Sequence, residues 1–287
     1  MPDSLTERLH AAAGQAGADI VGIAPIERFE DVAAEHHPLS IFPECRSVIV
    51  LGKRIVRGCL RGVEEGTQML LYHAFAVNWL PDRFMALTTV RVASWLEDQR
   101  WEAVPLPDLP VEVPPMGVPA KEGNPAPNVM VDFIDAAVRA GLGEIGLTGE
   151  LMTPQFGHRQ RVQLILTDAE LEPTPMLDGS VCDRCGACAE ACPLNAIDMD
   201  RSEATDICGK QMQVAKVDID LCRRCQNGAQ PNNRHASGRP DRLAASCMRA
   251  CAQHMHEAGL LENRFHESFR KRPAWMIDAS GVPRLEE

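Results

Sequence analysis

The sequence is poor in aromatic residues and has no long apolar run. Only 5% of its 287 residues are aromatic, a single tyrosine among them, and no stretch of 18 apolar residues occurs. A membrane-spanning helix needs about 20 such residues, so none is expected. The chain also lacks a basic surplus, because its formal net charge is −11 at pH 7. A nucleic-acid-binding surface normally carries an excess of Lys and Arg, so a nucleic-acid partner is not expected either.

Three further signals of function or location are missing. The glycines between residues 141 and 149 follow a predicted helix rather than a strand, so they do not form a nucleotide-binding GxGxxG fingerprint. No CxxxCxxC run occurs, which argues against radical S-adenosylmethionine chemistry. No apolar export segment stands at the start, where Ser4 and Glu7 instead indicate the capping box of an ordinary helix that ends near Gly17. We therefore expect a cytoplasmic protein.

Cysteine, in contrast, is abundant. Nine of the eleven cysteines lie between residues 182 and 251. The run VCDRCGACAEACPLNAI has the CxxCxxCxxxCP spacing of bacterial ferredoxins, in which three thiolates hold one [4Fe-4S] cluster and the fourth ligates a second cluster. The spacing therefore predicts a ferredoxin-like module with two [4Fe-4S] clusters.

The ferredoxin order assigns eight cysteines to these clusters. The first cluster would be held by Cys182, Cys185, Cys188 and Cys251, and the second by Cys192, Cys222, Cys225 and Cys247. The second set departs from ferredoxins, because 21 residues separate Cys225 from Cys247 and Ala252 stands where a proline would follow Cys251. Cys208 is left over and is an alternative to Cys222 as a ligand.

Two other uses of clustered cysteines are less favoured. A zinc ribbon takes four thiolates from CxxC pairs, but three cysteines within seven residues followed by CxxxCP exceed what zinc needs. A disulfide framework belongs to oxidising compartments, and nothing in the sequence points to one.

Ahead of the cysteines the sequence predicts an α/β domain. ADIVGIAP and the apolar run RSVIVLGKRI have strand length, and the second is expected to be buried in a sheet covered on both sides. Residues 66–101 predict two helical stretches broken or kinked at Pro81. Their larger apolar side chains are expected in the core, namely Trp79, Phe84, Leu87 and Trp95.

The rest of the chain completes the predicted domain organisation. Eight prolines between residues 105 and 127 predict a long irregular segment, which is often a lid or a linker. A helix is then expected to end at Gly141, and a strand to run from 162 to 168. We predict an α/β cofactor- and substrate-binding domain at 1–172, the ferredoxin-like domain at 173–260 and a tail at 261–287.

One segment adds a resemblance to a known family. AGLGEIGLTGELMTPQFGHRQRVQLILTD, directly before the cysteine run, resembles the corresponding segment of the cobalamin-dependent iron–sulfur reductases, namely reductive dehalogenases and epoxyqueuosine reductase. The resemblance covers roughly residues 10–255 and is strongest at 140–192. It implies a nitroreductase-like α/β domain that holds base-off cobalamin, with a ferredoxin module that delivers electrons to the cobalt.

The resemblance also implies a function and a cofactor site. We expect an oxidoreductase that acts on a small molecule and takes electrons from an external ferredoxin or flavodoxin. The implied cofactor contacts lie within the resembling segment: Gly141, Leu142, Gly143, Gly146, Thr153, Phe156, Gly157 and Arg161. Close backbone packing is an equally good use of these glycines. His158 and Arg159 are further candidates for a corrinoid side chain or an anionic substrate.

Proton donors are expected on two segments. LLYHAF carries a Tyr-His step similar to an element of epoxyqueuosine reductase, and reductive dehalogenases use a tyrosine as proton donor, which makes Tyr72 and His73 candidates. Asp132 and Asp135 lie three residues apart on a predicted helix and are further candidates. The alternatives are a buried structural tyrosine and aspartates on a solvated face.

Two other functions are compatible with the sequence. The chain would be an electron-transfer protein or reductive activator if it reduced a corrinoid protein without transforming a substrate of its own. It would be a flavin enzyme if the nitroreductase-like domain held FMN instead of cobalamin. Bound cobalamin or the spectrum of the extracted cofactor distinguishes these functions.

Overall fold

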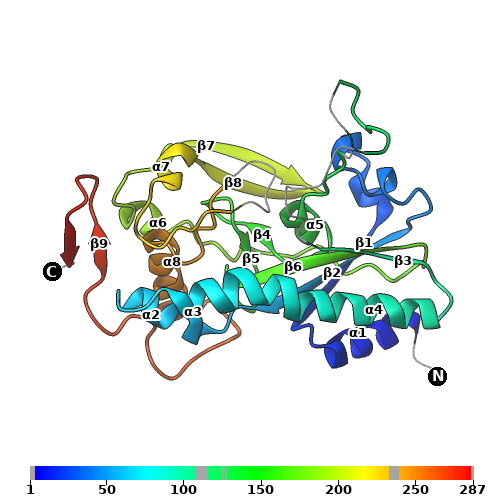
Figure 1. The fold of residues 1–287 in the computed structure, drawn as a ribbon, viewed down its shortest axis with the longest axis horizontal. Helices are drawn as coiled ribbons and strands as arrows, with labels where there is room; N and C mark the ends of the chain where they lie inside the picture. Colours follow the sequence, from blue (N-terminus) through cyan, green and yellow to red (C-terminus); the bar gives the residue numbers. More distant parts are fainter. Residues whose placement is uncertain (1–3, 108–115, 124–125, 127, 233–238, 286–287) are drawn as a thin grey trace.

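A four-stranded antiparallel sheet organises the N-terminal half of the chain (Figure 1). The computed structural model describes residues 4–107, 116–123, 126, 128–232 and 239–285. The strand order is β1-β2-β6-β3, with β1 at Ile20–Pro25, β2 at Ser47–Arg54, β6 at Gln160–Thr167 and β3 at Ala103–Leu106. The first six residues of β2 are all buried, as its continuous apolar run predicts. Pro105, the first proline of the predicted irregular segment, lies in edge strand β3, and part of that segment lies outside the described residues.

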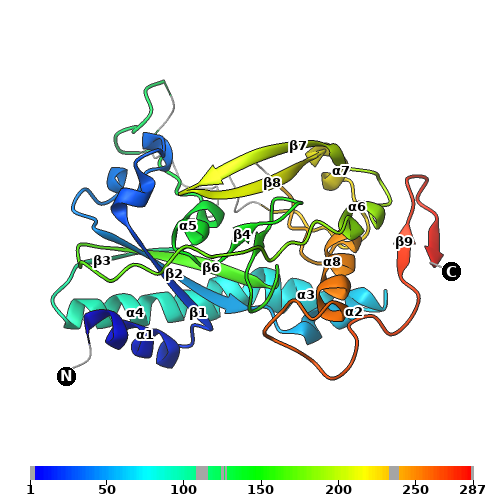
Figure 2. The ribbon, with the colours of Figure 1, turned by 180° about the vertical axis from the view of Figure 1, so that it is seen from behind.

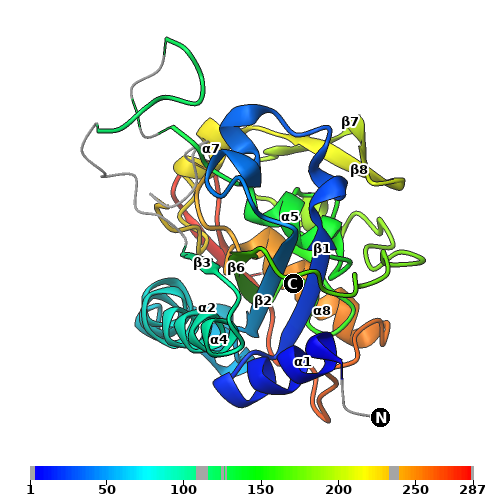
Figure 3. The same cartoon turned by 90° about the vertical axis from the view of Figure 1, so that its right-hand side faces the viewer.

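Helices cover both faces of this sheet (Figure 3). Ile49 and Leu51 of β2 pack against α1 (Leu5–Ala16) and α4 (Ala86–Asp98), while Val48 and Val50 face α5 (Phe133–Arg139). The predicted start of α1 is confirmed, because the Ser4 hydroxyl accepts a hydrogen bond from the Glu7 N–H and the Glu7 carboxylate accepts one from the Ser4 N–H. The predicted α/β layers are therefore present, with an antiparallel sheet.

The helical region around Pro81 differs from the prediction. The chain runs without a break from α3 (Leu70–Tyr72) through the π-helical segment η5 (His73–Met85) into α4. A proline ring clashes with the preceding turn of an α-helix, and the wider π turn accommodates it. The π turn also changes which residues face inward. Trp79, Phe84 and Leu87, predicted in the core, are 37, 43 and 50% exposed, while Tyr72 and Leu80 are buried.

The cysteine-rich part lies beside one end of the sheet (Figure 2). It contains the short strands β4 (Glu144–Ile145) and β5 (Leu151–Met152) and the hairpin of β7 (Ile197–Ile207) and β8 (Lys210–Val217). Its helices are α6 (Ala187–Glu190), α7 (Ile219–Arg223) and α8 (Ser246–Glu257). Ile207 and Met212 of the hairpin join the core formed by α5 and the sheet. Within the described residues no helix is long and apolar enough to cross a membrane.

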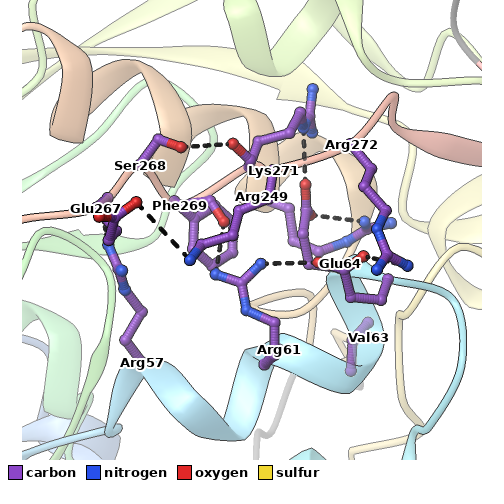
Figure 4. Close-up of polar contacts among 12 residues, drawn as sticks. Arg57, Arg61, Val63, Glu64, Arg249, Glu267, Ser268, Phe269, Lys271 and Arg272 are labelled. Atoms are coloured by element: carbon purple, nitrogen blue, oxygen red, sulfur yellow. Dashed lines mark hydrogen bonds and ion pairs between the residues drawn. The ribbon is translucent and has the colours of Figure 1, made fainter.

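The segment after α8 is fastened to the body of the protein. It leads to β9 (Trp275–Ile277) and β10 (Pro283–Leu285), and the Trp275 indole N–H donates to the Val63 carbonyl over 2.7 Å. At the end of α2 (Arg61–Glu64), the buried Glu64 carboxylate binds Arg249 of α8 at 2.8 Å and Arg270 at 2.7 Å (Figure 4). One buried cluster joins Val63, Ala252 and Phe269. The three predicted domains, whose boundaries stay a prediction, thus share a buried core.

Candidate functional site

Eight cysteines surround two separate pockets. The first cysteine pocket is lined by Cys182, Cys185, Cys188 and Cys251, and the second by Cys192, Cys222, Cys225 and Cys247. These are the two groups that the ferredoxin order assigns. Cys208 lines neither pocket; it lies in the turn between β7 and β8, where its thiol is 3.3 Å from the Arg28 carbonyl oxygen. All eleven cysteines are free.

Each of two short segments supplies one cysteine to the first pocket and one to the second. Cys188 lies in α6 and Cys192 follows it, while Cys247 and Cys251 both lie on α8. Residues four apart on a helix share one face. The packing of α6 beside α8 therefore brings four thiols from distant parts of the sequence together, two toward each pocket.

A buried carboxylate holds the first of these cysteines in place. Glu144, 3% exposed, accepts hydrogen bonds from the backbone N–H groups of Val181 and Cys182 at 2.8 and 2.7 Å and from the Ser180 hydroxyl at 2.8 Å. Lys210 lies 3.2 Å from its other oxygen. Glu144 belongs to AGLGEIG, so this motif positions the cysteine loop. The sequence did not predict that Glu144 would be buried and would bind the backbone of the cysteine loop.

The two pockets differ in their exposure. Cys185 is exposed, whereas Cys222 and Cys247 are 7 and 8% exposed. Burial raises the pKa of the Cys188 thiol to about 11 and that of Cys247 to about 12, and the Arg242 guanidinium only partly opposes this at Cys247. Buried thiols become thiolates when a bound metal supplies positive charge. Four converging cysteines at each pocket fit a thiolate-ligated metal centre.

A polar cavity of about 130 Å³ adjoins the second pocket. Its lining includes Glu150, His158, Arg161, Asp241 and Arg242, and Arg242 also lines the second cysteine pocket. The charged groups pair with one another: Arg161 binds Asp241, and Arg242 binds Glu150 at 2.6 Å. The cavity thus lies between strand β6 and the segment that precedes α8.

His158 is the most unusual of these lining residues. It is 2% exposed, and neither ring nitrogen has a hydrogen-bond partner among the described residues. Buried polar atoms normally have a partner, so its nitrogens are available to a group bound in the cavity. Burial, with a smaller contribution from Arg159, lowers the pKa of His158 to about 4. The imidazole is therefore neutral at pH 7.

This lowered pKa predicts a loss of stability in mild acid. The folded-state pKa of about 4 lies below the ordinary 6.5, so between these values the unfolded chain binds the extra proton and stability falls as the pH falls. We expect a loss of about 2 kcal/mol between pH 7 and 5. Urea unfolding across this range should show a weaker pH dependence for His158→Gln. The exposed His73→Gln serves as control; equal curves for all three proteins would contradict the prediction.

Most predicted cofactor contacts lie away from the cavity. Arg161 lines it, but the others do not: Gly141, Leu142, Gly143, Gly146, Thr153, Phe156 and Gly157. A Cβ atom at Gly141 or Gly143 would lie 2.1 Å from the carbonyl oxygen of Pro175 or Met152, respectively. Thr153 is fully buried and donates to Gln160 over 3.1 Å. Close backbone packing, the alternative interpretation, accounts for these glycines.

The predicted proton donors are also separated. His73 and Asp132 are exposed and do not line the cavity, and Asp132 is the N-cap of α5, where it accepts from the N–H groups of Ile134 and Asp135. Asp135 pairs with Arg139 at 2.6 Å. Asp132 thus caps the helix and Asp135 is paired, so both aspartates have a structural use. Tyr72 is buried, and its hydroxyl donates to Asp241 over 2.7 Å.

One family model and several known proteins are similar to parts of this chain. The family described as 4Fe-4S binding domain matches residues 175–198. The tetrachloroethene reductive dehalogenase of Desulfitobacterium hafniense is 45% identical over 67 residues, which are 22% of this chain and 12% of that protein. That of Sulfurospirillum multivorans is 36% identical over 76 residues, 25% of this chain and 15% of that protein.

A solved structure extends the similarity to the fold. The catabolic reductive dehalogenase NpRdhA in complex with 3-bromo-4-hydroxybenzoic acid matches with a TM-score of 0.54 and 17% identity over 86% of this chain and 31% of its own. The chain thus spans about a third of that protein. The resemblance to cobalamin-dependent iron–sulfur reductases is confirmed, and the structure has a mixed α/β fold similar to that of a reductive dehalogenase.

Proposed function

We propose that this chain is a cytoplasmic, cobalamin-dependent iron–sulfur reductase of a small molecule. The observation that carries the proposal is the position of Arg242, which lines both the four-cysteine second pocket and the polar cavity. A redox centre held by these cysteines would lie next to a site large enough for reacting groups. The nitroreductase-like character of the α/β domain belongs to this proposal, and so does an external ferredoxin or flavodoxin as electron donor.

The two cysteine pockets would hold two [4Fe-4S] clusters. The ligands would be the two sets of four that line them, with Cys222 rather than Cys208 in the second set. When bound, such clusters carry single electrons at low potential. The exposed Cys185 makes the first pocket the side from which an external electron donor has access. In the second pocket, Cys222 and Cys247 are buried and Cys192 and Cys225 are half-buried.

The polar cavity would hold part of a base-off cobalamin. The lining suits the amide side chains of a corrinoid, because both ring nitrogens of His158 lack a partner among the described residues and Arg161 also lines the cavity. A corrinoid would supply low-valent cobalt. Asp241 accepts the Tyr72 hydroxyl hydrogen bond and lines the cavity, so Tyr72 would hold the Asp241 carboxylate in place at the cavity wall. Burial and Asp241 raise the pKa of Tyr72, which keeps the phenol protonated.

The size of the cavity favours a second candidate function. About 130 Å³ is less than the 300–1,000 Å³ of pockets that enclose drug-sized ligands, and a corrinoid is larger still. A chain that reduces a corrinoid protein, without a corrinoid or substrate of its own, needs only the two cysteine pockets. Such an electron-transfer protein or reductive activator is the alternative.

Anaerobic reconstitution distinguishes these functions. The protein is loaded with iron and sulfide, with and without hydroxocobalamin, and then analysed for iron, cobalt and zinc and by electron paramagnetic resonance. The leading proposal expects about eight iron atoms and one base-off cobalt per chain. Two clusters without cobalt support the electron-transfer protein, and an extracted FMN spectrum supports a flavin enzyme. About four iron atoms, or zinc in place of iron, would overturn the two-cluster assignment.

A further inference from the structure

Arg242 has hydrogen-bond donors that the protein does not use. Its side chain is 1% exposed, and Nη2 donates to the Thr148 carbonyl at 2.7 Å and to Glu150 at 2.6 Å. Nε and Nη1 are buried and have no hydrogen-bond partner among the described residues, while the guanidinium as a whole lies beside the Cys222 thiol. Since Arg242 lines the second cysteine pocket, these two donors are available to whatever the four cysteines hold.

A second unused donor lies at the same pocket. Ser246, the first residue of α8, is 7% exposed, lines the second pocket, and its hydroxyl also lacks a partner among the described residues. It directly precedes Cys247, a lining cysteine. Two neighbouring buried side chains thus leave hydrogen-bond donors unpaired at one pocket.

The first cysteine pocket has no equivalent. Its charged lining residues are Asp183, Arg184 and His254, none of which is buried, and the Asp183 carboxylate accepts a hydrogen bond from His254 Nε2 at 2.6 Å. Among the residues that the structure describes, a buried cation therefore lines the second cysteine pocket but not the first. Charges act more strongly in a buried site than beside water, so the two pockets provide different electrostatic environments.

We propose that Arg242 and Ser246 tune the redox centre of the second pocket by donating hydrogen bonds to its sulfur atoms. Reduction adds one electron, and hence one negative charge, to a cluster without a proton. A buried guanidinium and N–H or O–H donors stabilise the added charge and raise the reduction potential. The second cluster would therefore be the more easily reduced of the two. The inference rests on the two-cluster assignment proposed above.

The test is an anaerobic potentiometric titration followed by electron paramagnetic resonance. The variants are Arg242→Met and Ser246→Ala, and Cys185→Ser identifies the signal of the first cluster. Arg239→Met is the matched control, because Arg239 also binds Glu150 and lines the cavity but not the cysteine pocket. Iron analysis of each variant shows first whether both clusters are present.

Arg242→Met should lower the reduced-to-oxidised ratio of the second cluster at least tenfold at a fixed potential, a shift of about 59 mV. Ser246→Ala should lower the reduction potential of the second cluster by a smaller amount. The potential of the first cluster should stay unchanged in both variants, and Arg239→Met should change neither potential. If Arg242→Met does not assemble the second cluster, Arg242→Lys, which keeps the charge with fewer donors, should give an intermediate shift. An unchanged potential with both clusters intact, or equal shifts of both clusters, would overturn the inference. Wild-type protein with one cluster would instead refute the two-cluster assignment.

Discussion

Replacing Cys222 by Ser should remove one of the two clusters, while the same replacement at Cys208 should remove none. The iron content of the reconstituted protein is expected to fall from about eight to about four atoms per chain in Cys222→Ser. Cys208→Ser should keep about eight. Iron and acid-labile sulfide analysis measures the outcome, and the electron paramagnetic resonance spectrum of Cys222→Ser should retain the signal of one cluster.

The difference follows from where the two side chains lie. Cys222 is 7% exposed and lines the second pocket with three other cysteines. Cys208 is exposed in the β7–β8 turn, where its φ of 51° is left-handed. Its thiol lies near Arg28 and Arg139, on the side of the hairpin that packs against the sheet domain. Loss of iron in Cys208→Ser with none in Cys222→Ser would reverse the ligand assignment.

These two cysteines show what sequence spacing can and cannot predict. The assignment of the cysteines at 182–192 follows from a short run whose spacing is local, and that of Cys247 and Cys251 follows from the order of cysteines in ferredoxins. The choice between Cys208 and Cys222 depends on the β7–β8 hairpin, which carries residue 208 to the far end of two strands. The spacing of apolar residues can predict that these strands exist, but it does not predict how far the β7–β8 turn, with Cys208, lies from the second cysteine pocket.

The polar cavity was harder to predict for a related reason. It combines residues 150–162 with residues 239–243, and only the tertiary fold brings these together. Its buried charges, Asp241 and Arg242, and the half-buried Glu150 are residue types usually found on the surface. The resemblance suggests His73, and the spacing to Asp135 on a predicted helix suggests Asp132, but both side chains are exposed in the fold. Tyr72 donates a hydrogen bond to Asp241, which lines the cavity and also binds Arg161. No local sequence pattern indicates this contact.

The same kind of buried charge predicts the largest effect on stability, at Glu64. Its carboxylate is 4% exposed and binds two arginines, Arg249 on α8 and Arg270 beyond it (Figure 4). Arg249 is fully buried, so Glu64→Gln leaves its charge without a counter-ion. Removing one member of a buried ion pair costs about 3–5 kcal/mol. Urea or thermal unfolding of the anaerobic protein should show a loss of this size.

Two comparisons make this prediction specific. Glu170→Gln removes an exposed partner of Arg46, and a surface pair contributes only about 0–1 kcal/mol. The double variant Glu64→Gln/Arg249→Met should regain part of the stability, because the second change removes the buried unpaired charge. Equal losses for Glu64→Gln and Glu170→Gln would contradict the argument. Since α8 carries Cys247 and Cys251, a destabilised α8 in Glu64→Gln should also release iron from both pockets faster than Glu170→Gln does.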